Sequence, residues 1–103
     1  MIVKSLILPD RVRKITGSFS WIDHRLLSGG FLSAMTKDEI LLYFFFVLVG
    51  DKNGLSFYSY DKICRLLKIE NYEFVQARDA LIKRQLICYK LGICQVLQLP
   101  SKS

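Results

Sequence analysis

Polar and basic side chains recur at helical spacing in two amphipathic stretches that meet at a short turn. One more basic side chain lies at a turn further along the chain. Amide side chains can pair with adenine edges, a tyrosine hydroxyl can reach a phosphate, and lysine and arginine attract phosphates. These side chains could together contact a nucleic acid. The alternative is that they form an ordinary solvated surface. The candidate residues are Lys62, Arg65, Lys68, Asn71, Tyr72, Gln76, Lys83 and Lys90.

Residue types suited to catalysis or metal binding are sparse. His24 is the single histidine, and no motif places a nucleophile with it or with the neighbouring Asp23. Cys64, Cys88 and Cys94 contain no CxxC pair, so neither a disulfide framework nor a zinc site is indicated. We therefore expect no enzyme, no catalytic residue, no metal, no cofactor and no small-molecule substrate, with the cysteines free in a reducing compartment.

Composition indicates one packed domain with a bias toward polyanions. The 103 residues are 51% hydrophobic and carry a formal net charge of +6 from 15 basic and 9 acidic side chains. Part of this charge lies in "DRVRK", residues 10–14, which either lies against phosphates or merely keeps an apolar chain in solution. The charge alone does not choose among nucleic acid, membrane surface and acidic protein.

No segment is expected to enter a membrane or to direct export. The longest apolar run, residues 40–49, is half the length of about 20 residues that a bilayer span requires. Near the N-terminus, Pro9 and Asp10 interrupt the apolar stretch before a signal-peptide core could form. The sequence therefore predicts a cytoplasmic protein without a membrane partner.

The chain divides into an N-terminal extension, residues 1–35, expected to pack on the core, and a domain over residues 36–100. In the extension, residues 3–8 and 18–23 are either strands or merely extended, and a brief helical turn after Asp23 ends at Gly29 and Gly30. The domain begins with a capping box, Thr36 with Glu39, which predicts a helix over 36–49.

Four further elements are expected in the domain. A short strand over 55–59 precedes a helix over 60–68, which Ser59 caps and whose apolar side carries Ile63, Leu66 and Leu67. The next helix, over 72–85, places Phe74, Ala77 and Leu81 on the core. Two strand-like runs around Leu91 and Gly92 then predict a hairpin, to which the earlier strand can add a third member.

This order of elements resembles the winged helix-turn-helix domains of bacterial replication initiators, transcription regulators and mobile-element accessory proteins. The resemblance covers residues 36–99. In it, "KDEILLYFFFVLVGDKNGLSFYSYDKICRLLKI" resembles the first helix, its turn and the helix that presents the corner, and "ENYEFVQARDALIKRQLI" takes the place of the recognition helix. The resemblance implies an α+β fold with a three-helix core and a C-terminal two-stranded β wing.

Two features depart from the family's pattern. Family members often open the recognition helix with basic residues, whereas here Glu70 and Glu73 flank its start, and over residues 70–85 the acids balance the bases. A neutral helix attracts phosphate weakly. Gln85 stands where glycine often precedes the wing, and it would have to take a left-handed conformation there.

The resemblance implies sequence-specific binding of double-stranded DNA, by a transcription regulator or a replication or mobile-element accessory protein. The alternative is a winged-helix module for protein–protein interaction or dimerisation, without direct DNA binding. A homodimer is expected, because three short helices and a hairpin offer little cover for the aromatic residues at 43–46 together with Trp21 and Phe31.

The turn of the predicted hairpin has two possible lengths. A three-residue loop over 90–92 pairs Tyr89 with Ile93 and puts Cys88 and Cys94 on one face with Leu86, whereas Ile87, Tyr89 and Ile93 share the other. A two-residue loop pairs Lys90 with Ile93 and sends the cysteines to opposite faces. We expect the first, because the second forces Leu91 to a positive φ, and in either case we expect two thiols.

Overall fold

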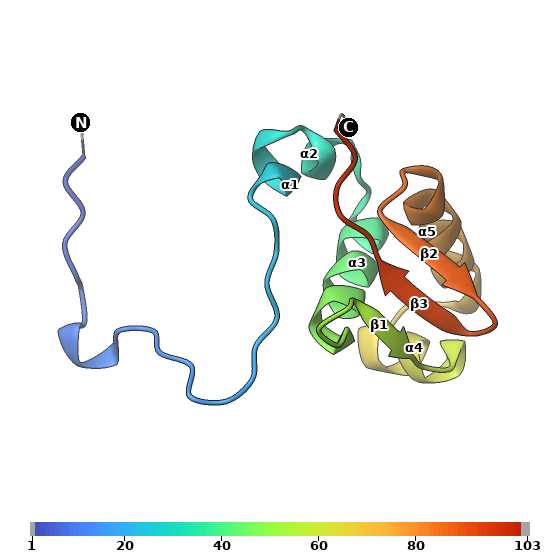
Figure 1. Cartoon of the computed structure of the whole chain (residues 1–103), viewed down its shortest axis with the longest axis horizontal. Helices are drawn as coiled ribbons and strands as arrows, with labels where there is room; N and C mark the ends of the chain where they lie inside the picture. The colour runs from blue at the N-terminus through green and yellow to red at the C-terminus, as the bar shows by residue number, and fades with distance from the viewer. Residues whose placement is uncertain (1, 102–103) are drawn as a thin grey trace.

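The computed structural model describes residues 2–101 and has an α+β fold, with five α-helices and a three-stranded antiparallel sheet in that part of the chain (Figure 1). Helices α3, α4 and α5 pack together, and α3 and α5 contact the sheet. The elements are a 3₁₀ turn at Pro9–Arg11, α1 (Arg25–Ser28), α2 (Phe31–Ala34), α3 (Lys37–Val49), β1 (Leu55–Phe57), α4 (Tyr60–Leu67), α5 (Asn71–Lys83), β2 (Ile87–Lys90) and β3 (Ile93–Val96).

Local capping determines where α3 and α4 begin. Thr36 Oγ1 accepts a hydrogen bond from the Glu39 backbone N–H at 3.2 Å and donates one to Glu39 Oε2 at 3.1 Å. Ser59 Oγ accepts from the Lys62 backbone N–H at 3.3 Å. Both caps were predicted, and both are confirmed, because a hydroxyl before a helix satisfies backbone donors that the helix leaves free.

The core lies between the three longer helices and the inner face of the sheet. The predicted core positions Phe74, Ala77 and Leu81 are buried. The prediction for Leu66 is wrong, since its side chain is 55% exposed. Helix α4 turns Ile63, Cys64 and Leu67 toward the core, and a residue two positions after Cys64 then points away from it. The largest fully buried side chains are Leu42, Phe46, Ile63, Phe74, Leu81, Leu86, Ile87 and Cys94.

The sheet has the order β1-β3-β2, so β1 supplies the predicted third strand. The hairpin between β2 and β3 pairs Lys90 with Ile93 and closes through the two residues Leu91 and Gly92, at φ 52° and 82°. The predicted three-residue loop is therefore wrong. Positive φ at both central residues matches the twist of the paired strands, and this outweighs a strain on Leu91 of about 1–3 kcal/mol.

This register also reverses the predicted faces of the hairpin. Cys94 is buried with Ile87 on the inner face, whereas Cys88 and Ile93 are exposed on the outer face. The expected grouping of Cys88 with Cys94 is wrong because the shorter loop shifts the pairing by one residue. All three cysteines are free thiols, as predicted. Gln85 takes the left-handed conformation that its position before β2 requires, at φ 63°.

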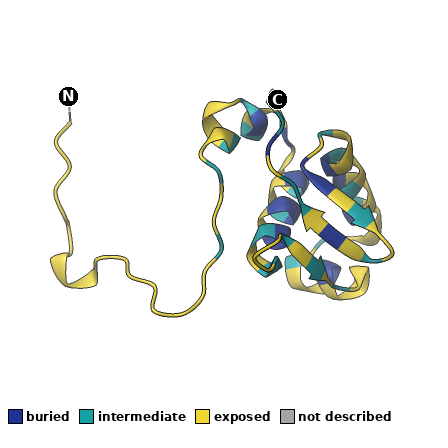
Figure 2. Ribbon diagram, viewed as in Figure 1, coloured by how far each residue is buried: buried dark blue, intermediate teal, exposed yellow. Residues whose placement is uncertain are grey.

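The N-terminal extension consists of two parts. Phe31 and Met35 are buried, so α2 and the residues after it pack on the core. Residues 2–19, which we call the arm, are exposed along their whole length and run away from the body (Figures 1 and 2). The expectation that the whole extension packs on the core is wrong for the arm, and residues 3–8 and 18–23 form no paired strand. Between residues 2 and 101, no helix has both the length and the apolarity to cross a bilayer.

Candidate nucleic-acid interface

Helices α4 and α5 meet at a tight corner of three residues, 68–70. Lys68 adopts a left-handed conformation at φ 59°, and its backbone N–H bonds to the carbonyl of Cys64. The N–H of Ile69 bonds to the same carbonyl at 3.1 Å. Two donors therefore close the end of α4, and α5 begins at Asn71 without a longer loop.

The start of α5 is stabilised by its own acidic residues. Glu73 Oε1 accepts from the backbone N–H of Glu70 at 2.7 Å, which is half of a capping box. Glu73 is half-buried in this position. One of the two carboxylates that reduce the attraction of this helix for phosphate thus has a structural reason to be there, at the positive end of the helix dipole.

The eight candidate residues are all exposed, and they fall into two groups. Lys62 and Arg65 lie on α4 and Lys68 directly follows it, whereas Asn71, Tyr72 and Gln76 lie in the first half of α5. Lys83 lies on the same side of α5 as Gln76, two turns and about 10 Å further along. Lys90 ends β2 at the hairpin turn. Six of the eight thus lie on α4, in the corner and in the first half of α5, and Lys83 and Lys90 lie further away.

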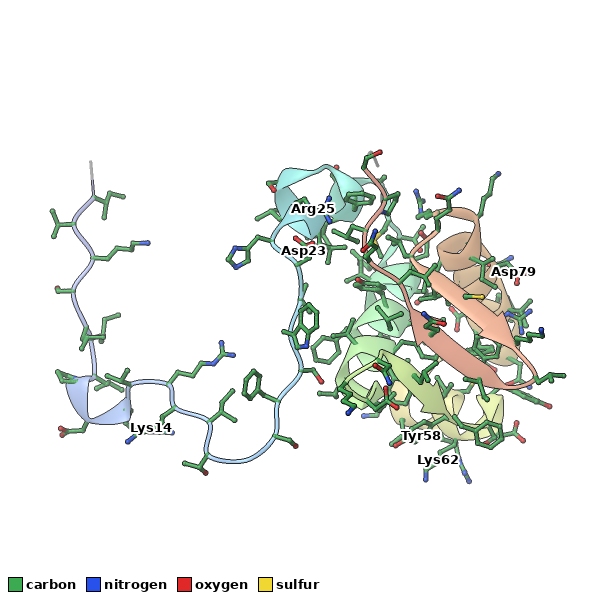
Figure 3. All side chains as sticks on the ribbon, in the orientation of Figure 1. Lys14, Asp23, Arg25, Tyr58, Lys62 and Asp79 are labelled. Carbon is green, nitrogen blue, oxygen red and sulfur yellow. The ribbon has the colours of Figure 1, made fainter. Side chains whose placement is uncertain are left out.

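Lys62 is positioned by an aromatic ring. Its Nζ lies 5.4 Å from the centroid of the Tyr58 ring, and Figure 3 shows the two side chains together at the edge of the body. A cation over a ring face is held by the quadrupole of the ring, and it keeps its charge available to a phosphate on its other side.

Two other arginines near α5 serve the fold. Arg78 Nη2 pairs with Asp79 Oδ1 at 3.0 Å, and its guanidinium lies 5.7 Å from the centroids of both the Phe74 and Tyr89 rings. Arg84 Nε pairs with the buried Glu39 Oε1 at 2.8 Å. Among the described ion pairs none involves a candidate residue, so the candidate cations are not neutralised by a direct partner in residues 2–101.

An apolar groove of about 370 Å³ separates the start of α5 from the hairpin. Sequence reasoning missed it, because its walls come from four elements. Phe57 is 71% exposed at its rim and packs on the hairpin turn, where a Cβ on Gly92 would lie 2.8 Å from Phe57 Cε1. The one sequence feature that could have indicated this groove is the alternation in "LSFY", which places Phe57 on the outer face of a strand. The groove is also lined by Tyr58, Tyr60, Phe74, Val75, Arg78 and Tyr89.

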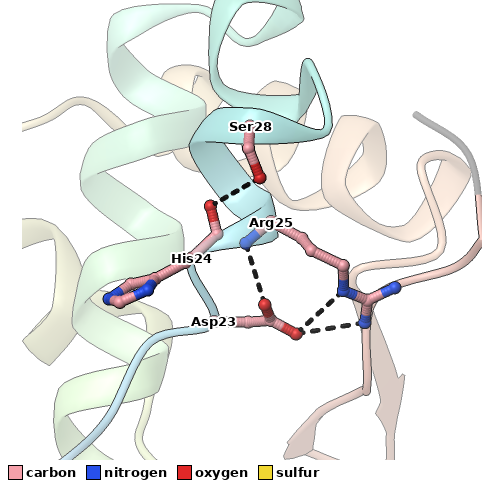
Figure 4. Close-up of polar contacts among 4 residues, drawn as sticks. All are labelled: Asp23, His24, Arg25 and Ser28. Carbon is pink, nitrogen blue, oxygen red and sulfur yellow. Dashed lines mark hydrogen bonds and ion pairs between the residues drawn. The ribbon is translucent and has the colours of Figure 1, made fainter.

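The neighbours Asp23 and His24 do not form an acid–base couple. Asp23 accepts from the backbone N–H of Arg25 at 2.8 Å and from its guanidinium at 3.0 and 3.2 Å, and these bonds lower the pKa of the carboxyl group (Figure 4). The carbonyl of His24 accepts from Ser28 Oγ at 3.3 Å. These contacts organise the first turn of α1.

The described residues hold no group of three or more His, Cys, Asp or Glu side chains arranged to bind a metal ion. Burial raises the pKa of the Cys94 thiol to about 12, so this cysteine stays protonated in the core. No protein-family model, no curated protein and no solved structure matches this chain.

Proposed function

We propose that this chain is a winged helix-turn-helix protein that binds double-stranded DNA and has no catalytic activity. In this proposal α3, α4 and α5 are the three core helices, α5 is the recognition helix and the β2–β3 hairpin is the wing. The observation that carries it is the corner between α4 and α5, where three exposed cations on α4 and at its end are followed by three exposed polar side chains in the first half of α5.

The two helices have different roles in this proposal. Lys62, Arg65 and Lys68 contact phosphates, because the first helix of such a corner crosses the DNA backbone. The first half of α5 enters the major groove, where Asn71 and Gln76 hydrogen-bond base edges. Contacts to phosphates fix the position of the protein, and contacts to bases select the sequence.

The remaining candidate residues act at the margins. Tyr72 is 64% exposed at the start of α5 and reaches a phosphate through its hydroxyl. Lys83 and Lys90 are phosphate contacts from the far end of α5 and from the wing. Over residues 70–85 the three acidic groups balance the three basic groups, so most of the phosphate attraction has to come from α4 and the wing.

Variants distinguish the two kinds of contact. Lys62→Ala with Arg65→Ala is expected to weaken binding to all duplex sequences alike, whereas Asn71→Ala or Gln76→Ala is expected to change the order of preference among sequences, at about 1–3 kcal/mol per base contact. The measurement is selection from a randomised duplex pool followed by titration of the enriched sequences. Lys37→Ala is the control, since it removes an exposed cation at the start of α3. Unchanged binding and preference in every variant would contradict the proposal.

A second candidate function is a protein-interaction module that uses the same surface. The groove beside α5 favours it, because Phe57 and Tyr60 are 71% and 52% exposed next to a nearly apolar wall. Phe57→Ala separates the two functions. It should weaken capture of a protein partner strongly, but it should change DNA affinity by less than Lys62→Ala does, because it removes no charge.

A further inference from the structure

The arm exposes more apolar surface than a short terminal segment ordinarily does. Seven large apolar side chains in residues 2–15 are each between 46% and 93% exposed: Ile2, Val3, Leu6, Ile7, Leu8, Val12 and Ile15. The radius of gyration is 15.8 Å, compared with about 13 Å for a compact chain of this length. Exposed apolar surface on this scale marks a site of interaction.

The body of the molecule carries an uncovered apolar strip that matches the arm in character. Ile40, Phe44 and Leu48 succeed one another at intervals of four residues along α3 and are 36%, 52% and 57% exposed. We call these residues the α3 row. They form a continuous ridge about 12 Å long on one side of the helix. Of the aromatic residues that suggested a dimer, Tyr43, Phe45, Phe46 and Phe31 are buried, whereas Phe44 and Trp21 are exposed.

The arm leaves the body beside one end of the α3 row. Ser20 Oγ donates to the carbonyl of Leu48 at 3.1 Å, and residues 18–21 line a cavity together with Val47 and Leu48. From this anchor the arm runs outward instead of back along its own helix, and Lys14 lies well away from the body (Figure 3). The single chain thus leaves both the arm and the adjacent row uncovered.

We propose that a second copy of this chain covers both surfaces, by exchange of N-terminal arms. In the resulting dimer, residues 2–8 of each chain lie on the α3 row of the other chain, and the two arms cross near the Ser20 anchors. A contact in which each copy donates the same segment and accepts it on the same patch is isologous, so it closes at two copies.

Reach and area both fit this arrangement. The nine residues between Leu8 and Ser18 allow the Cα atoms of these two residues to lie up to about 33 Å apart when the chain is extended, which is enough to cross to a neighbouring copy. Residues 2–8, about 20 Å long, then exceed the length of the row. If each of the five large apolar side chains in residues 2–8 loses about 100 Å² of exposed surface, one arm buries about 500 Å². Two arms and the surfaces that receive them therefore reach the area of about 1,200–2,000 Å² that is typical of stable interfaces.

The test uses sedimentation velocity on the full-length chain at tens of micromolar. Wild type is expected to be a dimer. Leu6→Asp with Ile7→Asp in the arm, and Phe44→Asp in the row, are each expected to weaken dimerisation by at least tenfold, about the loss expected for one buried apolar side chain. Ser5→Asp is the matched control for the arm variant. Leu66→Asp is the control for the row variant, because Leu66 lies on α4, outside the row, and is 55% exposed, close to the 52% of Phe44. Both should remain dimers.

Mixing the two variants tests the exchange itself. The row variant still has an intact arm and the arm variant still has an intact row, so an equimolar mixture should form a heterodimer with one of the two contacts. A mixture that stays monomeric would mean that the arm binds its own chain. A monomeric wild type would also overturn the proposal, and arm variants that then lose affinity for duplex DNA or for anionic vesicles would identify the arm as an element for binding that ligand instead. The proposal does not depend on DNA binding by the rest of the chain.

Discussion

Replacing Arg84 by methionine should destabilise the fold more than any other removal of a surface-accessible charge. Arg84 lies just after α5, and its Nε donates to Glu39 Oε1 at 2.8 Å, whereas its Nη2 donates to the carbonyl of Ala34 at 2.7 Å. One side chain therefore connects the end of α5 to the start of α3 and to the end of α2. Methionine keeps the apolar stem and removes the charge and both hydrogen bonds.

The size of the effect follows from the burial of the two partners. The Glu39 side chain is 8% exposed, and without Arg84 its carboxylate retains the hydroxyl of Thr36 at 3.1 Å as its side-chain donor. Removing one partner of a buried pair costs about 3–5 kcal/mol. The Arg84 side chain is 33% exposed, so water can replace part of what is lost, and we expect about 2–3 kcal/mol. For a domain of this size that lowers the melting temperature by about 10–20 °C.

Urea denaturation of wild type, Arg84→Met, Glu39→Gln and the double variant measures this cost and its origin. If the cost arises from a carboxylate left without its partner, Glu39→Gln should recover at least about 1 kcal/mol in the Arg84→Met background, because it removes the buried charge. Arg65→Met is the matched control and should stay within about 0.5 kcal/mol of wild type. A loss below that level for Arg84→Met, or strictly additive losses in the double variant, would refute the reasoning.

Two further predictions concern the hairpin. Leu91→Asn should raise the melting temperature by several degrees, because asparagine tolerates a positive φ before glycine. Gly92→Ala should lower it, since its Cβ would clash with the ring of Phe57. A lower melting temperature for Leu91→Asn, or an unchanged or higher one for Gly92→Ala, would contradict this account of the turn. In the folded protein the pKa of Cys94 is about 12, above its ordinary value of 9.0. At any pH between these two pKa values, unfolding releases the thiol proton. Stability should therefore fall by up to about 1.4 kcal/mol per pH unit from pH 9 upward, and Cys94→Ala should flatten the slope relative to Cys88→Ala in denaturation curves at several pH values.

Local signals predicted the helical part of the fold well. Thr36 and Ser59 were recognisable as caps from their type and from the residues that follow them. Phe74, Ala77 and Leu81 follow helical spacing, which is sufficient to identify the buried face of α5. Each of these features depends on residues within one or two turns of each other, so sequence patterns contain the necessary information.

Features that depend on distant residues were not predicted. The pair of Glu39 and Arg84 joins residues far apart in the chain, and the groove beside α5 combines walls from separate elements. The hairpin turn was predicted wrongly because the prediction considered only the local strain on Leu91. It left out the pairing of β2 with β3 that the shorter loop permits. The position of the arm was also missed, since an apolar sequence indicates burial without indicating which surface provides it.

The most direct test of DNA binding by the corner between α4 and α5 is the salt dependence of binding to a labelled duplex. Fluorescence anisotropy between about 50 and 200 mM salt gives the slope of log K against log salt concentration, which is about −0.9 for each phosphate contact. We predict salt-dependent binding by wild type and a slope less steep by about 2 in the Lys62→Ala, Arg65→Ala double variant. Absence of duplex binding, or the same slope in wild type and the double variant, would contradict the proposal that this corner contacts DNA.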